Sequence, residues 1–227
     1  MAISVLGESF RLAEAFTISR GTKTEANVLT ATATADDHKG WGECVPYARY
    51  GETPESVAAV IEALPDDLTR ADLQSALPPG AARNAVDCAL WDLEAKLAGK
   101  RAWDLAGLRA PGPVTTAYTL SLGTPEDMRR AAARASDRPL LKIKLGGEGD
   151  MARLEAVRAG APSSRIIVAA NEGWTAESYR ELAPHLLRLG VEMVEQPLPA
   201  GQDDMLAEIE RPLPVCADES CHDRGSL

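Results

Sequence analysis

The stretch Leu-Leu-Lys-Ile-Lys-Leu-Gly-Gly at positions 140–147 places two lysines, Lys142 and Lys144, inside an apolar run. Side chains alternate between the faces of a strand, so both ammonium groups point to one face, roughly 6 to 7 Å apart at the backbone. Like charges this close make each other easier to deprotonate. A lysine with an ordinary pKa of about 10.4 must fall toward roughly 7 to 8 to act as a general base at neutral pH. The pair therefore predicts a catalytic base or, on an edge strand, two surface lysines that block aggregation.

Outward from this stretch, strand-like and helix-like runs alternate through the second half of the chain. Thr-Pro-Glu at 124–126 and Thr-Ala-Glu at 175–177 are helix starts, and Gly190 is a helix stop. This alternation predicts a parallel sheet with right-handed crossovers, either an open doubly wound sheet or a barrel. No glycine-rich phosphate fingerprint opens a helix, which disfavours nucleotide binding. The expected strands are 115–121, 140–145, 165–170, 191–195 and 214–217, and the expected helices are 125–136, 149–160, 175–189 and 202–210.

The first hundred-odd residues follow a different pattern. A run at 28–35 ends in Asp-Asp-His-Lys-Gly, which is typical of a hairpin, and a returning strand is expected at 40–46. Thr53, followed by proline, starts a helix, and a longer amphipathic helix is expected at 81–97, before Gly99. The sequence therefore predicts an α+β domain at 1–113. The α/β part occupies 114–227 with only about five β/α units, too few to close an eight-stranded barrel.

Bulk properties narrow the class of protein. The chain has 227 residues, of which 45% are hydrophobic and 26% are charged, as in ordinary globular proteins. Its net charge of −10 argues against a nucleic-acid partner. No signal-peptide pattern or membrane-spanning apolar stretch is present, so we expect a cytoplasmic protein without a membrane partner. The cysteines and histidines do not fall at the spacings of zinc ligands. A homo-oligomer is compatible with the sequence.

Acidic residues follow the expected strands after the lysine pair. In a parallel barrel the reacting groups come from the C-terminal ends of successive strands. The next strands end in Asn-Glu-Gly-Trp at 171–174, Val-Glu-Gln-Pro at 194–197 and Ala-Asp-Glu-Ser at 217–220. Glu195 and Asp218 are thus expected beside the lysines, where hard oxygen ligands suit Mg²⁺. The alternative for either acid is a solvated loop position.

These motifs together resemble the muconate-lactonizing branch of the enolase superfamily, in order and in spacing. The helix at 85–99 looks like the helix that closes that family's capping domain. The segments 16–21 and 116–120 look like those of the dipeptide epimerases. The usual substrates of those epimerases are Ala-Glu dipeptides. The resemblance covers essentially the whole chain. It implies an N-terminal α+β capping domain at 1–113 followed by an α/β domain of the (β/α)8-barrel type at 114–227, here with only about five β/α units.

The resemblance implies a Mg²⁺-assisted 1,1-proton transfer at the α-carbon of an acidic dipeptide such as L-Ala-L-Glu. In that family a bound Mg²⁺ neutralises the enediolate, and a lysine serves each face of the substrate. By motif match, Lys144 would be one acid/base and Lys142 its electrostatic neighbour. Glu195 and Asp218 would be metal ligands.

Two more residues are expected to bind this small-molecule substrate, by the same resemblance. Arg20, on a capping loop, would face the distal carboxylate, because a guanidinium pairs with a carboxylate through two hydrogen bonds. Thr119 would contact the substrate at the end of the first barrel strand. The alternative for Arg20 is an ordinary surface arginine.

The sequence departs from the family at two places. Ala169 stands where the family has an aspartate as its first metal ligand, and a methyl group cannot coordinate Mg²⁺. An eight-stranded barrel takes about 250 residues, so the chain ends before the family's opposing lysine, and we expect a C-terminally truncated form. Weak Mg²⁺ binding and little or no epimerisation are therefore predicted.

Two alternative functions stay open. The first is another reaction on the same scaffold, either muconate cycloisomerisation or an o-succinylbenzoate synthase-like dehydration. Arg20 weakly favours a substrate with an acidic side chain. The second, from another class, is a non-catalytic fragment that acts as a folding or binding partner of another chain. Ala169 and the early end of the chain favour that second alternative.

Overall fold

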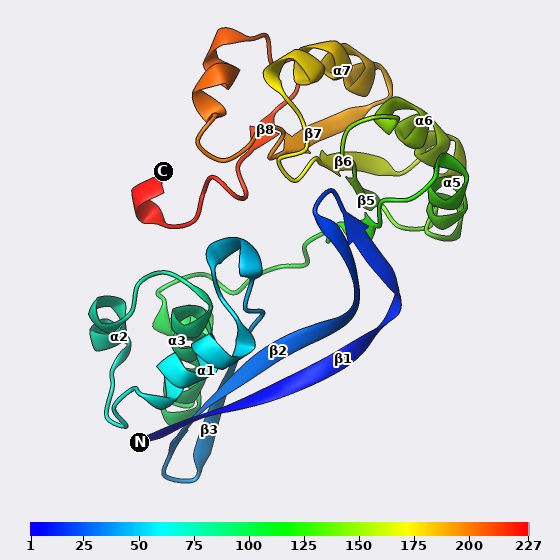
Figure 1. The fold of residues 1–227 in the computed structure, drawn as a ribbon. Coiled ribbons are helices and arrows are strands. Elements are labelled where there is room, and N and C mark those ends of the chain that lie inside the picture. The colour runs from blue at the N-terminus through cyan, green and yellow to red at the C-terminus, as the bar shows by residue number, and fades with distance from the viewer. Residues whose placement is uncertain (227) are drawn as a thin grey trace. The chain divides into compact units, whose positions relative to one another are not determined.

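The computed structural model describes residues 1–226 and divides into two compact units (Figure 1). The first unit comprises Met1–Leu12 and Glu25–Pro113, and the second comprises Ala13–Thr24 and the chain from Val114 onward. The tip of the first hairpin thus groups with the barrel unit. The sequence analysis did not predict that residues 13–24 belong to the second unit. The division into two domains after residue 113 stays a prediction.

A three-stranded sheet in the order β1-β2-β3 forms the first part of the chain. Its strands are β1 (Ala2–Ile18), β2 (Gly21–Ala35) and β3 (His38–Cys44). β2 and β3 are antiparallel, with Leu29 opposite Cys44, and Asp36 takes a left-handed conformation (φ 51°) in the connecting turn. The helical elements that follow are η1 (Ala48–Tyr50), α1 (Pro54–Glu62), α2 (Arg70–Ala76), α3 (Ala81–Leu97) and α4 (Ala102–Leu105).

Helix α3 lies against β3 at backbone contact distance. A Cβ on Gly40 would lie 2.1 Å from the Ala89 carbonyl oxygen, and one on Gly42 would lie 2.0 Å from that of Ala85. Only glycine fits at these two positions, because no real Cβ contact is that short. The helix contributes Val86 to an apolar core shared with the inner face of β2.

Five parallel strands form the sheet of the second unit, in the order β4-β5-β6-β7-β8. A doubly wound sheet reverses its strand order, whereas this one follows the chain without reversal, as barrels do. The strands are β4 (Tyr118–Leu120), β5 (Leu140–Lys144), β6 (Arg165–Ala169), β7 (Val191–Glu195) and β8 (Val215–Cys216). Between and after them lie α5 (Pro125–Arg134), α6 (Asp150–Gly160), α7 (Ala176–Arg188), η2 (Asp203–Glu208) and η3 (Arg224–Ser226).

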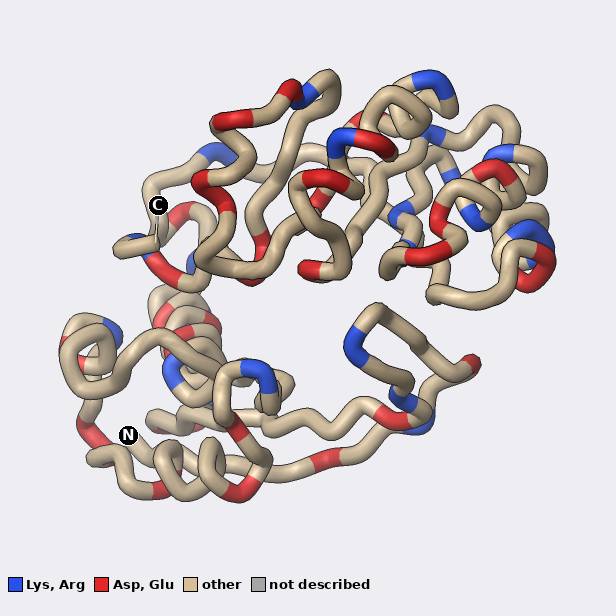
Figure 2. The backbone as a smooth tube through the Cα atoms, turned by 45° about the horizontal axis from the view of Figure 1, so that its top comes forward, with Lys and Arg blue, Asp and Glu red and all other residues tan. Residues whose placement is uncertain are grey.

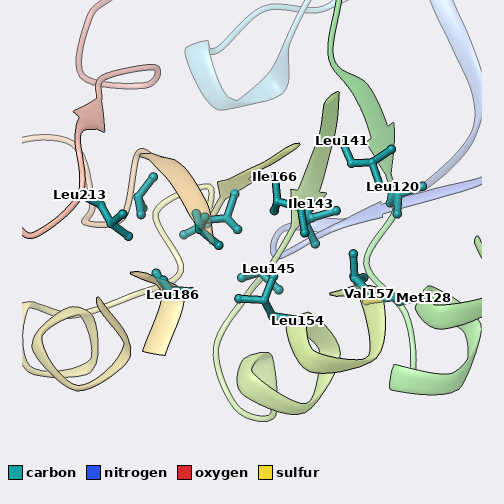
Figure 3. Packing of buried hydrophobic residues seen from close by; sticks show 14 of the residues in the cluster. Leu120, Met128, Leu141, Ile143, Leu145, Leu154, Val157, Ile166, Leu186 and Leu213 are labelled. Carbon is teal, nitrogen blue, oxygen red and sulfur yellow. The ribbon is translucent and has the colours of Figure 1, made fainter. Parts of the chain in front are cut away.

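The apolar core of the second unit lies between its sheet and its helices (Figure 3). Leu141 and Ile143 on β5 are fully buried, in one cluster with Leu154 and Val157 of α6. Because strand side chains alternate, this packing turns the intervening lysines of β5 to the opposite face of the sheet. The core therefore fixes the direction in which the lysine pair points.

Two local expectations differ from the structure, and one strand was not predicted. The expected helix at 202–210 is the 3₁₀ helix η2, and the expected strand at 115–121 shortens to β4. The 17-residue strand β1 was not foreseen, because its side chains do not alternate cleanly between apolar and polar. Arg20, which was expected on a capping loop, lies in the tight turn between β1 and β2.

Acidic and basic positions are interspersed along the backbone of both units (Figure 2). Within residues 1–226, no helix has both the length and the apolar character that crossing a membrane requires.

Candidate active site

One row of residues runs across the carboxyl ends of four neighbouring strands. Lys144 of β5 pairs in register with Ala169 of β6, which pairs with Glu195 of β7, which pairs with Cys216 of β8. Residues in register on parallel strands share a face of the sheet. Lys144, Ala169 and Glu195 therefore line the face away from the helices. Asp218 follows Cys216 by two positions, just past the end of β8.

Lys144 is the buried lysine of the pair, at 8% exposure. Its Nζ donates to Oδ1 of Asn171 at 2.9 Å. Burial lowers the pKa of Lys144, and the neighbouring ammonium of Lys142 lowers it further, against partial opposition from nearby carboxylates. A lysine with a depressed pKa on the inner face of a parallel sheet suits a general base. The alternative of two lysines on an edge strand is wrong, since β5 lies between β4 and β6.

Lys142 lies on the same face as Lys144 but has a different partner. Its Nζ donates to both carboxylate oxygens of Glu195, at 2.7 Å to Oε1 and 2.6 Å to Oε2. This ion pair crosses from β5 to β7 over the intervening strand β6. On the other side of β5, Thr119 of β4 is in register with Lys142. The lysine pair thus has one member bound to an acid and one bound to an amide.

The two acids proposed as metal ligands lie in different environments. Glu195 is buried, at 9% exposure, so a solvated loop position is wrong for it. Asp218 is more exposed, yet partial burial of its carboxyl raises its pKa, and the charges of Glu219 and Glu195 raise it further. Within residues 1–226 no three His, Cys, Asp or Glu side chains are grouped so as to hold a metal ion.

A second network joins the hairpin turn to the ends of β6 and β8. Arg20 Nη1 lies 2.7 Å from Oε1 of Glu219 and 3.1 Å from Oε2 of Glu172. Asn171, in a left-handed conformation (φ 47°), donates from Nδ2 to the same Glu219 oxygen at 3.2 Å. Its carbonyl accepts hydrogen bonds from Arg20 and Ser19, at 3.0 Å each. Arg20 therefore reaches the neighbourhood of Lys144 through Asn171 and Glu219.

Sequence reasoning did not select Asn171 or Glu219 as site residues. Both lie inside the motifs at 171–174 and 217–220, so proximity to a strand end was the available signal. Burial raises the pKa of Glu219, but the hydrogen bonds from Asn171 and Arg20 outweigh it, and the net pKa is lowered. The other oxygen, Oε2 of Glu219, is buried and has no hydrogen-bond partner within the described chain.

Buried polar side chains hold the loops that carry this site. The Asp150 carboxylate accepts hydrogen bonds from the backbone of Gly146 and Gly147 and, at 2.8 Å, from Nε1 of Trp174. It thereby ties the loop after β5 to the loop after β6. Gln196 accepts from the backbone nitrogens of Asp218 at 2.9 Å and Ser220 at 3.0 Å, which fixes the segment after β8.

Comparisons with known proteins agree with this architecture. Residues 2–107 match the N-terminal domain of mandelate racemase/muconate lactonizing enzymes, and residues 126–227 match the enolase C-terminal domain-like family. The L-Ala-D/L-Glu epimerase of Escherichia coli K12 is 44% identical in an alignment 231 residues long, which covers 99% of this chain and 72% of that protein. The chain therefore belongs to the enolase superfamily, and the resemblance and fold class expected from the sequence are confirmed.

Solved structures add similarity in three dimensions. An enolase family member from Agrobacterium tumefaciens with homology to dipeptide epimerases, with bound sodium and L-Ala-L-Glu, has a TM-score of 0.95 and 52% identity. The match covers 99% of this chain and 70% of that one. The dipeptide epimerase of Cytophaga hutchinsonii, complexed with Mg and D-Ala-L-Val, has a TM-score of 0.90 and 28% identity, covering 100% of this chain and 68% of that one.

Proposed function

We propose that this chain carries the proton-abstraction half of a dipeptide epimerase site, with Lys144 as the base at the α-carbon of an acidic dipeptide such as L-Ala-L-Glu. The observation that carries the proposal is the buried Lys144 ammonium, whose pKa is lowered by burial and by Lys142. The similarity to an L-Ala-D/L-Glu epimerase and to a structure with bound L-Ala-L-Glu supports the choice of substrate class.

Glu195 and Asp218 are the residues that would hold Mg²⁺ in this site. Mg²⁺ is commonly bound by one or two carboxylates and keeps several of its waters, so this pair of acids fits the ion. When bound, the ion would supply electrostatic stabilisation of the enediolate. Ala169 brings only a methyl group into the row between Lys144 and Glu195, so the site lacks a third carboxylate there. We therefore propose that cation binding is weak and that turnover by this chain is impaired.

Arg20 and Thr119 are the proposed contacts to the substrate. Arg20 is engaged with Glu219 and Glu172, so a substrate carboxylate would bind by replacing one of these acids. Thr119 lies one strand away from the lysines, in register with Lys142. Because only Lys144 is proposed as a base, the described chain would exchange the α-proton of one epimer and not of the other.

Solvent exchange of the α-proton tests the proposal directly. L-Ala-L-Glu and L-Ala-D-Glu are incubated separately in deuterated water with Mg²⁺ and either the chain or its Ala169→Asp variant, and loss of the α-proton signal is followed by NMR. We expect exchange with one epimer in Ala169→Asp and far slower exchange in the unchanged chain.

Ala169→Asn is the matched control, since it has nearly the size of aspartate without its charge. It should not restore exchange. No exchange in a folded Ala169→Asp variant would contradict the role of Lys144 and favour the non-catalytic alternative. Fast turnover by the unchanged chain would contradict the proposed impairment.

A further inference from the structure

Both oxygens of the Glu195 carboxylate accept a hydrogen bond from a side chain of the same molecule. Lys142 Nζ lies within 2.7 Å of both carboxylate oxygens, and the two side chains are only 23% and 12% exposed. An ammonium bound to both oxygens occupies the side of the carboxylate on which a cation would otherwise bind. Because the pair is largely shielded from solvent, water screens its attraction less than it screens a surface ion pair.

The geometry of this ion pair depends on what stands between its partners. Neighbouring strands lie about 4.8 Å apart, so the backbones of β5 and β7 are separated by roughly 9.6 Å, and the lysine must reach over β6. On β6, Ile167 is in register with Lys142 and Ala169 is in register with Glu195, so the lysine runs diagonally from the level of Ile167 to that of Ala169. The methyl group of Ala169 rises little above the sheet, so the lysine side chain can pass over it. A carboxylate at position 169 would stand in that path and would attract the ammonium to itself.

We infer that Lys142 is a tethered competitor for the divalent cation, so that the Lys142–Glu195 ion pair and a cation at Glu195 exclude one another. This inference rests on the proposed function in one respect, namely that Glu195 is a cation ligand. Two positive charges on one carboxylate repel each other, and the lysine, being covalently attached, has the higher local concentration. Ala169 then weakens cation binding twice, because it removes a ligand and leaves the path of the competitor open.

The expected consequence is that removal of the Lys142 ammonium tightens cation binding. Mn²⁺ alone is titrated into the full 227-residue chain, and free Mn²⁺ is measured by electron paramagnetic resonance. Exposed ion pairs contribute at most about fivefold to an equilibrium, and this pair is better shielded, so Lys142→Met should lower the Mn²⁺ dissociation constant by at least that factor. Lys142→Gln should act in the same direction, and provides a second variant should Lys142→Met not fold.

Two variants separate displacement of a competitor from a general change in charge. Lys142→Arg keeps a cation opposite Glu195 and should not tighten Mn²⁺ binding. Lys144→Met removes one positive charge from the same face, two residues away, but its partner is Asn171 rather than Glu195. It should tighten Mn²⁺ binding clearly less than Lys142→Met does.

Three results would count against these ideas, and they are distinguishable. Unchanged or weaker Mn²⁺ binding in folded Lys142→Met and Lys142→Gln overturns the inference. Equal tightening in Lys144→Met overturns it too, because charge alone would then explain the effect. If Glu195→Gln leaves Mn²⁺ affinity unchanged in every background, Glu195 is not a cation ligand, and the metal assignment of the proposed function fails as well.

Discussion

The two units of this chain bury different kinds of side chain. In residues 1–226 every buried charged side chain lies in the second unit, whereas the core of the first is apolar. Burying a charge is costly unless it is paired and hydrogen-bonded. In the second unit Lys144 and Glu219 are buried at the strand ends, each with a shifted pKa. The comparison indicates that the first unit is built for packing and that the second holds the chemistry.

The largest effect should come from the buried lysine of the second unit. In the Ala169→Asp background, Lys144→Met should slow α-proton exchange by roughly 10²- to 10⁴-fold, the usual contribution of a general base. Methionine has a similar length and no charge to desolvate, so the thermal unfolding temperature should not fall. NMR measures the rate of α-proton exchange, and circular dichroism measures the thermal unfolding temperature. Persistent exchange would remove Lys144 from its proposed role.

The next effect should come from backbone packing in the first unit. Gly42→Ala would place a Cβ 2.0 Å from the carbonyl oxygen of Ala85, and the helix backbone cannot move away without disturbing the core. We expect a loss of about 3 kcal/mol in the free energy of unfolding, measured by urea denaturation. Gly112→Ala is the control, since nothing lies within 4 Å of its added Cβ. Equal stability of the two variants would show that α3 and β3 do not depend on this contact.

A buried acid without a proposed chemical role should have a smaller effect, measured here as a loss of stability. Asp150→Ala leaves the backbone nitrogens of Gly146 and Gly147 and Nε1 of Trp174 without their acceptor. The expected loss in the free energy of unfolding is about 2 kcal/mol. Asp137→Ala removes an acid whose side chain is 79% exposed and should change it by less than about 0.5 kcal/mol. An unchanged free energy of unfolding in Asp150→Ala would mean that water replaces the lost acceptor.

The smallest effect should appear in the pH dependence of stability. The pKa of Glu219 is lowered from 4.5, so the folded state binds fewer protons than the unfolded state as the pH falls through this region. Glu219 therefore contributes stability above its unfolded pKa that is lost as the pH falls through its folded pKa. Between about pH 6 and about pH 3, Glu219→Gln should lose less stability than the unchanged chain.

Urea denaturation at several pH values measures this difference. Glu155→Gln is the control, because Glu155 is an exposed acid on helix α6. The same loss of stability in the Glu219→Gln variant and the unchanged chain would mean that the hydrogen bonds from Asn171 and Arg20 do not lower the pKa of Glu219.

Much of the fold followed from local signals. Thr53 and Thr175 accept hydrogen bonds from the backbone nitrogens three residues on, as their positions before Pro54 and Ala176 predicted, and Gly190 takes the left-handed conformation (φ 71°) of a helix stop. Helix α3 spans Ala81–Leu97, as its periodicity indicated. The long strand β1 could not be predicted in the same way, because none of its positions is buried and its side chains do not alternate between apolar and polar.

The sequence by itself determined that Lys142 and Lys144 share a face and that acids follow the later strands, because the two-residue period of a strand is a local property. Only the tertiary structure decided which partners meet. Strand order and register bring Lys142 to Glu195, 53 positions away, and leave Asn171 to bind Lys144. Such contacts depend on which strands become neighbours, and that is settled by the packing of the whole sheet rather than by any one segment.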